Sequence, residues 1–174
     1  GVYDMSLTMI TDPPPQHMSA FEKVIGGITS NKIKVIRGRL PRTVLFEKYL
    51  SNSDVFILPS YIHFFGFVML EAMAYGLPLI GSDIYAMPEI VENGVNGFTV
   101  TPPLSCFDSS LMKPSTHLGN YRSQILKEGV WTSVVDQLVG CISKLAENRS
   151  LRERMGQASR QMVEKGRFSV LERK

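Results

Sequence analysis

A glycine and a glutamate at the start of one helical segment are the residues of this chain best suited to chemistry. Gly66 stands where the strand-like run 54–58 and a loop give way to a helix. A residue without a Cβ lets main-chain N–H groups come close to a ligand, and the unpaired donors and dipole of a helix start favour a phosphate by about 0.3–1 kcal/mol. Glu71 follows at i+4 from Phe67, so its carboxylate can face the same cleft. The pair indicates a phosphate site beside an acceptor for ligand hydroxyls.

The same segment also fits a purely structural role. In that interpretation it is the buried crossover helix of a parallel sheet, and Gly66 is an ordinary loop glycine. The core stripe of such a helix would consist of Phe67, Leu70, Met73 and Ala74. Spacing alone leaves both interpretations open.

Strand and helix patterns alternate along the rest of the chain and determine where this site lies. Strand patterns occur at 7–11, 32–36, 54–58, 78–82 and 97–101, and further helical patterns at 18–28, 43–51, 87–92, 125–145 and 151–163. Short loops and nearly continuous apolar strands predict an α/β fold, a Rossmann-like parallel sheet with helices on both faces. Ligands of such folds bind at the carboxyl ends of the strands, and Gly66 follows one of these ends.

The length of 174 residues suits one compact domain with its own core. From 102 to 121 the periodic pattern stops, and Pro, Ser, Asp, Cys and Gly replace the regularly spaced apolar residues. This composition predicts an irregular insertion loop.

Composition narrows the class of protein. A net charge of +3, spread along the chain, argues against a nucleic-acid partner and leaves peripheral attachment to an anionic membrane open. Cys106 and Cys141 match no paired-cysteine spacing, which predicts free thiols in a reducing compartment, the cytoplasm or the inner face of a membrane. His17 and His117 have no acidic or cysteine partner at ligand spacing, so we expect no metal site.

Several short motifs follow one another in a distinctive order. They are Val35–Gly38, Tyr49, Ser53–Ser60, Phe65–Gly66, Glu71–Pro78, Gly81–Asp83, Pro88–Val91, Asn93–Phe98, Leu151–Arg152 and Met155–Gly156. Together they resemble the carboxyl-terminal, donor-binding domain of the retaining GT-B glycosyltransferases of family 4. The resemblance implies that the chain is one half of a GT-B fold and serves a hexosyltransferase reaction.

The resemblance also implies a donor site. Main-chain groups at Phe65, Gly66, Phe67 and Val68 would hold the diphosphate and sugar of the donor, and Glu71 would hold the ribose hydroxyls. The base would lie near the loop after the strand 32–36, and its neighbours would be Gly38, Leu40 and Arg42. For Arg39 and Arg42, solvated surface charge is the alternative to a contact with the base. The donor would be a UDP- or GDP-linked sugar with no further cofactor, and the acceptor, whether glycan, lipid or small molecule, is unknown.

One departure from the family pattern concerns catalysis. The family motif has a glutamate eight positions before the one that matches Glu71, and His63 stands there. Imidazole can replace the hydrogen bonds of that glutamate to the transferred sugar, but it carries no fixed negative charge at neutral pH. Three interpretations stay open: an active enzyme with altered sugar selectivity, a binding protein that has lost the chemistry, and a loop histidine with a structural bond.

A second departure concerns the beginning of the chain. The family's first strand–helix unit of this domain, with an arginine and a lysine that clamp the diphosphate, has no counterpart here, and neither has the amino-terminal acceptor domain. We therefore expect residues 1–174 to be a donor-binding fragment that is inactive in isolation. The alternatives to a transferase are a noncatalytic sugar-nucleotide-binding protein and a GT-B nucleotide-sugar epimerase.

Overall fold

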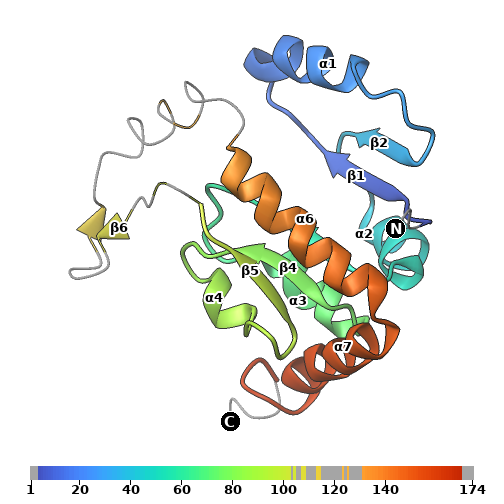
Figure 1. Ribbon diagram of the computed structural model, residues 1–174, viewed down its shortest axis with the longest axis vertical. Helices are drawn as coiled ribbons and strands as arrows, with labels where there is room; N and C mark the ends of the chain where they lie inside the picture. Colours follow the sequence, from blue (N-terminus) through green and yellow to red (C-terminus); the bar gives the residue numbers. More distant parts are fainter. Residues whose placement is uncertain are drawn as a thin grey trace. The chain divides into compact units, whose positions relative to one another are not determined.

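The computed structural model describes residues 4–102, 104, 107–108, 113–114, 123, 125 and 131–169 (Figure 1). The chain divides into two compact units, Gly1–Tyr49 and Leu50–Lys174. Each unit is described by itself below.

The first unit contains a two-stranded parallel sheet. Strand β1 (Leu7–Thr11) pairs with β2 (Ile33–Arg37), with Leu7 opposite Ile33. Between them lie a 3₁₀ turn (Pro15–His17) and helix α1 (Met18–Gly26), which stops where a second glycine follows. These elements confirm the predicted strands and the predicted helix, with ends shifted by one or two residues.

The predicted helix 43–51 is helical but not one regular α-helix. It begins as α2 (Arg42–Val44), continues as a π-helical turn (Leu45–Tyr49) and finishes, in the second unit, as a 3₁₀ turn (Leu50–Asn52). The hydrogen-bonding pattern therefore changes twice within three turns. Apolar spacing over about ten residues indicates a helical segment, but it does not show which carbonyl each N–H bonds, and this is what distinguishes the three helix types.

The second unit is built on a three-stranded parallel sheet with the order β3-β4-β5. Its strands are β3 (Phe56–Leu58), β4 (Leu79–Ser82) and β5 (Gly97–Val100), and its helices are α3 (Phe67–Ala74), α4 (Met87–Ile90), α6 (Thr132–Glu147) and α7 (Arg149–Glu164). Ile57 lies opposite Ile80, and Ile80 lies opposite Phe98. Side chains alternate between the two faces of a sheet, so these three residues share one face.

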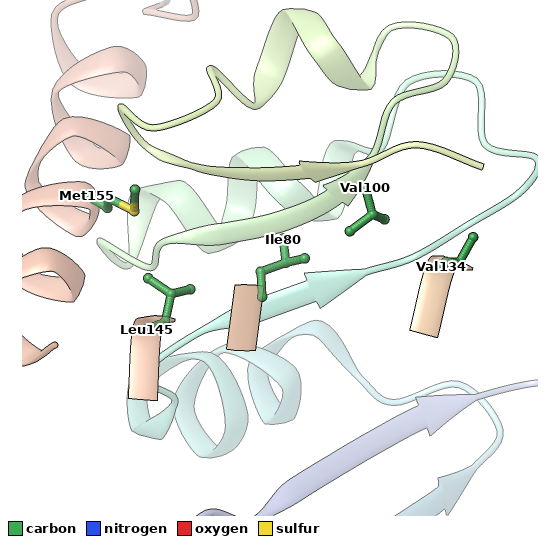
Figure 2. Packing of buried hydrophobic residues seen from close by; sticks show 5 residues of the cluster. All are labelled: Ile80, Val100, Val134, Leu145 and Met155. Atoms are coloured by element: carbon green, nitrogen blue, oxygen red, sulfur yellow. The ribbon is translucent and has the colours of Figure 1, made fainter. Parts of the chain in front are cut away.

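Helices cover both faces of this sheet. On the face of Ile80, the core includes residues of α6 and α7, and Figure 2 shows Ile80, Val100, Val134, Leu145 and Met155 gathered there. On the other face, a Cβ added to Gly81 would lie 2.8 Å from the Met69 Cε atom of α3 and 3.2 Å from the Val91 Cγ2 atom. The predicted Rossmann-like α/β architecture is therefore confirmed.

Asn96 fixes the turn that leads into β5. Its side-chain oxygen accepts the Glu92 N–H at 2.7 Å, and its amide donates to the Ile90 carbonyl at 3.0 Å. Asn96 is completely buried, so both bonds are shielded from water and hold the end of α4 against the start of β5. The motif Asn93–Phe98 thus has a structural role.

The core stripe expected for α3 is wrong at two positions. Phe67 is 72% exposed and Ala74 is also exposed, whereas Met69, Ala72 and Met73 are buried. Glu71 is the only charged residue of α3, so the helix is apolar nearly all round and the sequence pattern does not specify the buried face. The fit of Met69 against Gly81 selects it instead.

Few residues of the predicted insertion loop 102–121 are described. Within it, β6 (Phe107–Asp108) pairs in antiparallel fashion with β7 (Lys113–Pro114). Cys106 and most of this stretch, like residues 126–130 of the predicted helix 125–145, lie outside the described residues. The boundaries of the loop and of the donor-binding domain stay predictions.

Two further features concern a cysteine of α6 and the lengths of the helices. Cys141 is a free cysteine in α6, half-buried, and its burial raises the pKa of the thiol above the ordinary value. Within the described residues, no helix combines the length and the apolar character needed to span a bilayer.

Candidate functional site

The loops that leave the carboxyl ends of β3 and β4 form the candidate site. The β3–α3 loop covers residues 59–66, and the β4–α4 loop covers residues 83–86. The two strands are parallel neighbours, so both loops leave the same edge of the sheet. In open α/β sheets this edge is where ligands bind.

Gly66 is the N-cap of α3 and has a left-handed backbone, with φ 75° and ψ 48°. Its carbonyl accepts the Met69 N–H at 2.8 Å, which closes the first turn tightly. As far as the described residues show, no side chain caps this helix and its first turn holds no acidic residue. The positive end of the helix dipole is therefore not neutralised by a carboxylate, as binding of an anion requires.

His63 lies against Gly66. A Cβ built on Gly66 would stand 3.6 Å from the His63 Cδ2 atom and 3.1 Å from the Met69 Sδ atom. The half-buried imidazole is thus next to the start of α3, as the spacing from Glu71 predicts. Glycine serves two purposes here, since it tolerates the positive φ and leaves room for both side chains.

We expect Gly66→Ala to lower the free energy of unfolding by more than the backbone alone would cost. A left-handed alanine costs about 1–2 kcal/mol, and the contact of 3.1 Å with Met69 adds crowding. Gly94→Ala is the matched control, because Gly94 has φ +82° and nothing within 4 Å of an added Cβ. Urea unfolding of both variants measures the difference, and equal losses would show that Met69 and His63 leave the space at Gly66 open.

Aromatic rings surround this turn. The Phe65 and Phe67 rings lie 4.8 Å apart, and the Phe64 ring lies 5.2 Å from the Tyr85 ring in an edge-on arrangement. Phe64 is 68% exposed, so it does not belong to the core. Tyr61, on the same loop, packs against the core, and burial raises the pKa of its hydroxyl.

Two further predicted donor-binding residues lie on α3. Val68 and Glu71 are half-buried on α3. Because Cα–Cβ bonds of a helix tilt toward its amino terminus, Glu71 leans toward the end that Gly66 caps. Main-chain groups at 65–68 therefore lie at the start of α3, and Glu71 lies one turn further along the same helix.

The residues predicted to border a base lie in the first unit, at the end of β2. Gly38 has φ +85°, and its N–H donates to the Thr11 carbonyl at 3.0 Å. Leu40 is half-buried, and the Arg42 guanidinium lies 5.3 Å from the centroid of the Phe46 ring. Arg39, which is 92% exposed, pairs with Asp12 at 3.4 Å.

A pocket lies at the opposite, amino-terminal edge of the second unit's sheet. Its volume is about 410 Å³, and its lining includes Asp54, Tyr75, Pro78, Arg149 and Glu153. Arg149 pairs with Glu153 at 2.8 Å, and this pairing raises the pKa of the guanidinium. Two of the charged residues that line the pocket thus pair with each other.

The described ranges contain no cluster of three or more His, Cys, Asp or Glu side chains that could hold a metal ion. The groups that the described residues bring to the start of α3 are backbone donors, aromatic rings and one histidine.

Sequence reasoning missed Tyr85. Its backbone has φ 48°, in the left-handed region, and its ring contacts Phe64. No pattern in the sequence signals this, because tyrosine is not a residue type that favours a positive φ.

Comparison with known proteins identifies relatives of this chain. A bacterial sucrose synthase from Melioribacter roseus is 37% identical over 75 residues, which cover 41% of this chain and 10% of that enzyme. The chain thus matches only a small part of the length of that relative.

Solved structures share the fold. The C-terminal domain of LpcC from Francisella tularensis, a glycosyl transferase group 1 family protein, superposes with a TM-score of 0.65 at 19% identity, covering 92% of this chain and 68% of that one. HepE from Anabaena in complex with UDP superposes with a TM-score of 0.67 at 17% identity, covering 97% of this chain and 38% of that one. HepE has also been solved in complex with UDP-glucose. These likenesses confirm the prediction of a Rossmann-like half of a GT-B fold.

A family model covers the part of the chain that contains the candidate site. Residues 2–107 match the model of the glycosyl transferases group 1. The match includes β1 to β5 and both loops of the candidate site. This chain therefore belongs to the glycosyl transferases group 1 family.

Proposed function

We propose that this chain is the donor-binding part of a retaining, family 4 hexosyltransferase that uses a UDP- or GDP-linked sugar. One observation carries the proposal: the left-handed Gly66 caps α3 at the carboxyl end of β3, and the His63 imidazole lies against it. This arrangement offers backbone donors to an anion. It also offers the His63 side chain to the sugar that is attached to the anion.

The diphosphate and the ribose are assigned to different parts of α3. Main-chain groups at 65–68 would receive the diphosphate, because the first turn presents N–H groups and the positive end of the dipole. Glu71 would accept two ribose hydroxyls, each bond worth about 1.5–3 kcal/mol when shielded from water. The base would lie near Gly38, Leu40 and Arg42. The UDP complex of HepE, a protein of the same fold, supports a uridine nucleotide as the first to test.

His63 would contact the transferred sugar. Retention of configuration requires stabilising an oxocarbenium-like centre beside the departing diphosphate, whose own oxygen can assist the incoming hydroxyl. Such a reaction depends on positioning and electrostatics more than on a protein nucleophile. Neutral imidazole can donate or accept one hydrogen bond to a sugar hydroxyl.

We further propose a cytoplasmic location with peripheral attachment to a membrane.

His63→Ala in the intact protein should lower turnover at least about tenfold, equivalent to 1.4 kcal/mol of barrier. The affinity for the nucleoside diphosphate should stay within about threefold, because the imidazole faces the sugar rather than the nucleotide. Steady-state kinetics and calorimetry measure the two quantities. If diphosphate binding is lost together with turnover, His63 holds the loop; if turnover is unchanged, the residue has no part in the reaction.

A noncatalytic sugar-nucleotide-binding protein is the second candidate function, and the histidine in place of the family's glutamate favours it. Product analysis with UDP- and GDP-sugars separates the cases. Transfer with retained configuration supports the proposal, whereas inversion at a ring carbon of the donor indicates an epimerase. Binding without turnover, converted to transfer by His63→Glu, would show that the protein is a sensor descended from an enzyme.

A further inference from the structure

Tyr85 has a backbone conformation that is unfavourable for a residue with a side chain. Among the described residues it is the only non-glycine residue with a positive φ, at 48°. The left-handed region brings the Cβ close to the following carbonyl oxygen, so such residues persist where the surroundings hold them, and they concentrate at functional sites.

The surroundings of Tyr85 are well anchored. Ile84 and Met87 are buried on either side of it, with 7% and 0% of their surface exposed. The Met87 N–H donates to the Ile84 carbonyl at 3.0 Å, which closes a turn around Tyr85. The half-buried ring therefore has little freedom to move with its loop.

The ring of Tyr85 supports an exposed ring from the neighbouring loop. The Phe64 and Tyr85 centroids lie 5.2 Å apart with an interplanar angle of 60°, the edge-on geometry that aromatic pairs favour. Phe64 is 68% exposed, although burial would be favourable for a side chain of this size. Ligand sites are lined largely by hydrophobic and aromatic side chains, so an exposed ring beside the candidate site is in a position to contact a ligand.

The aromatic pair lies beside the proposed sugar position. Phe64 is the chain neighbour of His63, whose Cδ2 atom lies 3.6 Å from the place that a Cβ of Gly66 would take. The Phe64–Tyr85 contact thus ties the β4–α4 loop to the residue next to the imidazole.

We propose that Tyr85 is a positioning residue and Phe64 a specificity-determining residue for the pyranose ring of the donor. The electron-rich face of Phe64 packs against the polarised C–H groups of the sugar, and Tyr85 holds both Phe64 and His63 in the required place. This inference rests on the proposed function, since it names the part of the same site that receives the sugar.

The test compares two variants of Tyr85 by calorimetry in the intact protein, with UDP-glucose and UDP as probes and GDP-mannose and GDP as the second pair. Tyr85→Gly should bind the nucleotide sugar about tenfold more weakly and the free diphosphate within twofold of the wild type. Urea unfolding checks that this variant is folded, because the relief of the strained backbone offsets part of the packing lost with the ring. Tyr85→Phe, which keeps the ring, should restore sugar binding.

Phe64→Ala should reproduce the selective loss of nucleotide-sugar affinity. Val139→Ala is the matched control, because Val139 is another exposed apolar residue, 57% exposed, and lies on α6 outside the site. An equal loss for the nucleotide sugar and the free diphosphate would overturn the proposal, and so would a change confined to the acceptor's KM.

A readout that needs no donor separates this inference from the proposed function. The chain has three histidines, so the His63 ring resonances can be assigned by NMR. They should shift in Tyr85→Gly and stay in place in Tyr85→Phe. If the His63 resonances stay in place in both variants, Tyr85 does not position His63. If the resonances shift as expected but the wild type binds no nucleotide sugar, only the proposed function fails.

Discussion

Glu71→Gln is expected to weaken binding of the nucleotide sugar by about 1–3 kcal/mol, the scale for losing hydrogen bonds to a charged group. The amide has nearly the same shape as the carboxylate, so the change removes the charge and one acceptor while leaving the packing of α3 in place. Glu71 is half-buried and is the only charged residue of that helix. Partial burial excludes some of the water that would otherwise weaken the bonds.

Calorimetry on the folded variant measures this effect, and the ribose provides a sharper test. If Glu71 holds ribose hydroxyls, the substitution should cost less with 2′-deoxyuridine diphosphate than with UDP, because one of the bonds is already missing. Glu89→Gln is the control, since Glu89 is an exposed acid in the first turn of α4 and its loss changes the net charge equally. Unchanged affinity for UDP in Glu71→Gln would return Glu71 to a structural role.

Gly156→Ala is expected to destabilise the chain by about 3 kcal/mol, at the upper end of the usual cost of overpacking. A Cβ at this position of α7 would lie 2.1 Å from the Gly76 carbonyl oxygen and 3.1 Å from its carbon. Both atoms belong to the backbone that connects α3 to β4, so they cannot move aside as a flexible side chain would. Helix α7 must therefore shift away from the helix that carries Gly66 and Glu71.

Gly140→Ala is the matched control, because it places the same methyl group on a neighbouring helix. Gly140 lies within α6 and has nothing within 4 Å of an added Cβ. Alanine is favoured over glycine in a helix by about 1 kcal/mol, so this variant should be stabilised by up to that amount. Urea unfolding compares the two, and equal midpoints would contradict the close approach of α7 to Gly76.

The sequence by itself determined the elements and the class of fold. Strands β3, β4 and β5 arise from short apolar runs separated by helical patterns, and such alternation has few topological solutions. The position of Gly66 between loop and helix was also readable, because glycine at a loop-to-helix junction is a local signal. His63 was expected near Gly66 because the two residues are only three positions apart in the chain.

Only the tertiary structure decided which surfaces meet. Helix α3 is apolar nearly all round, so its buried face was fixed by the fit of Met69 against Gly81 rather than by periodicity. The Phe64–Tyr85 contact joins residues 21 positions apart, and it exists because β3 and β4 pair side by side. The approach of Gly156 to Gly76 likewise depends on how α7 packs. A sequence pattern records local preference, whereas these contacts depend on the volume and shape of distant partners.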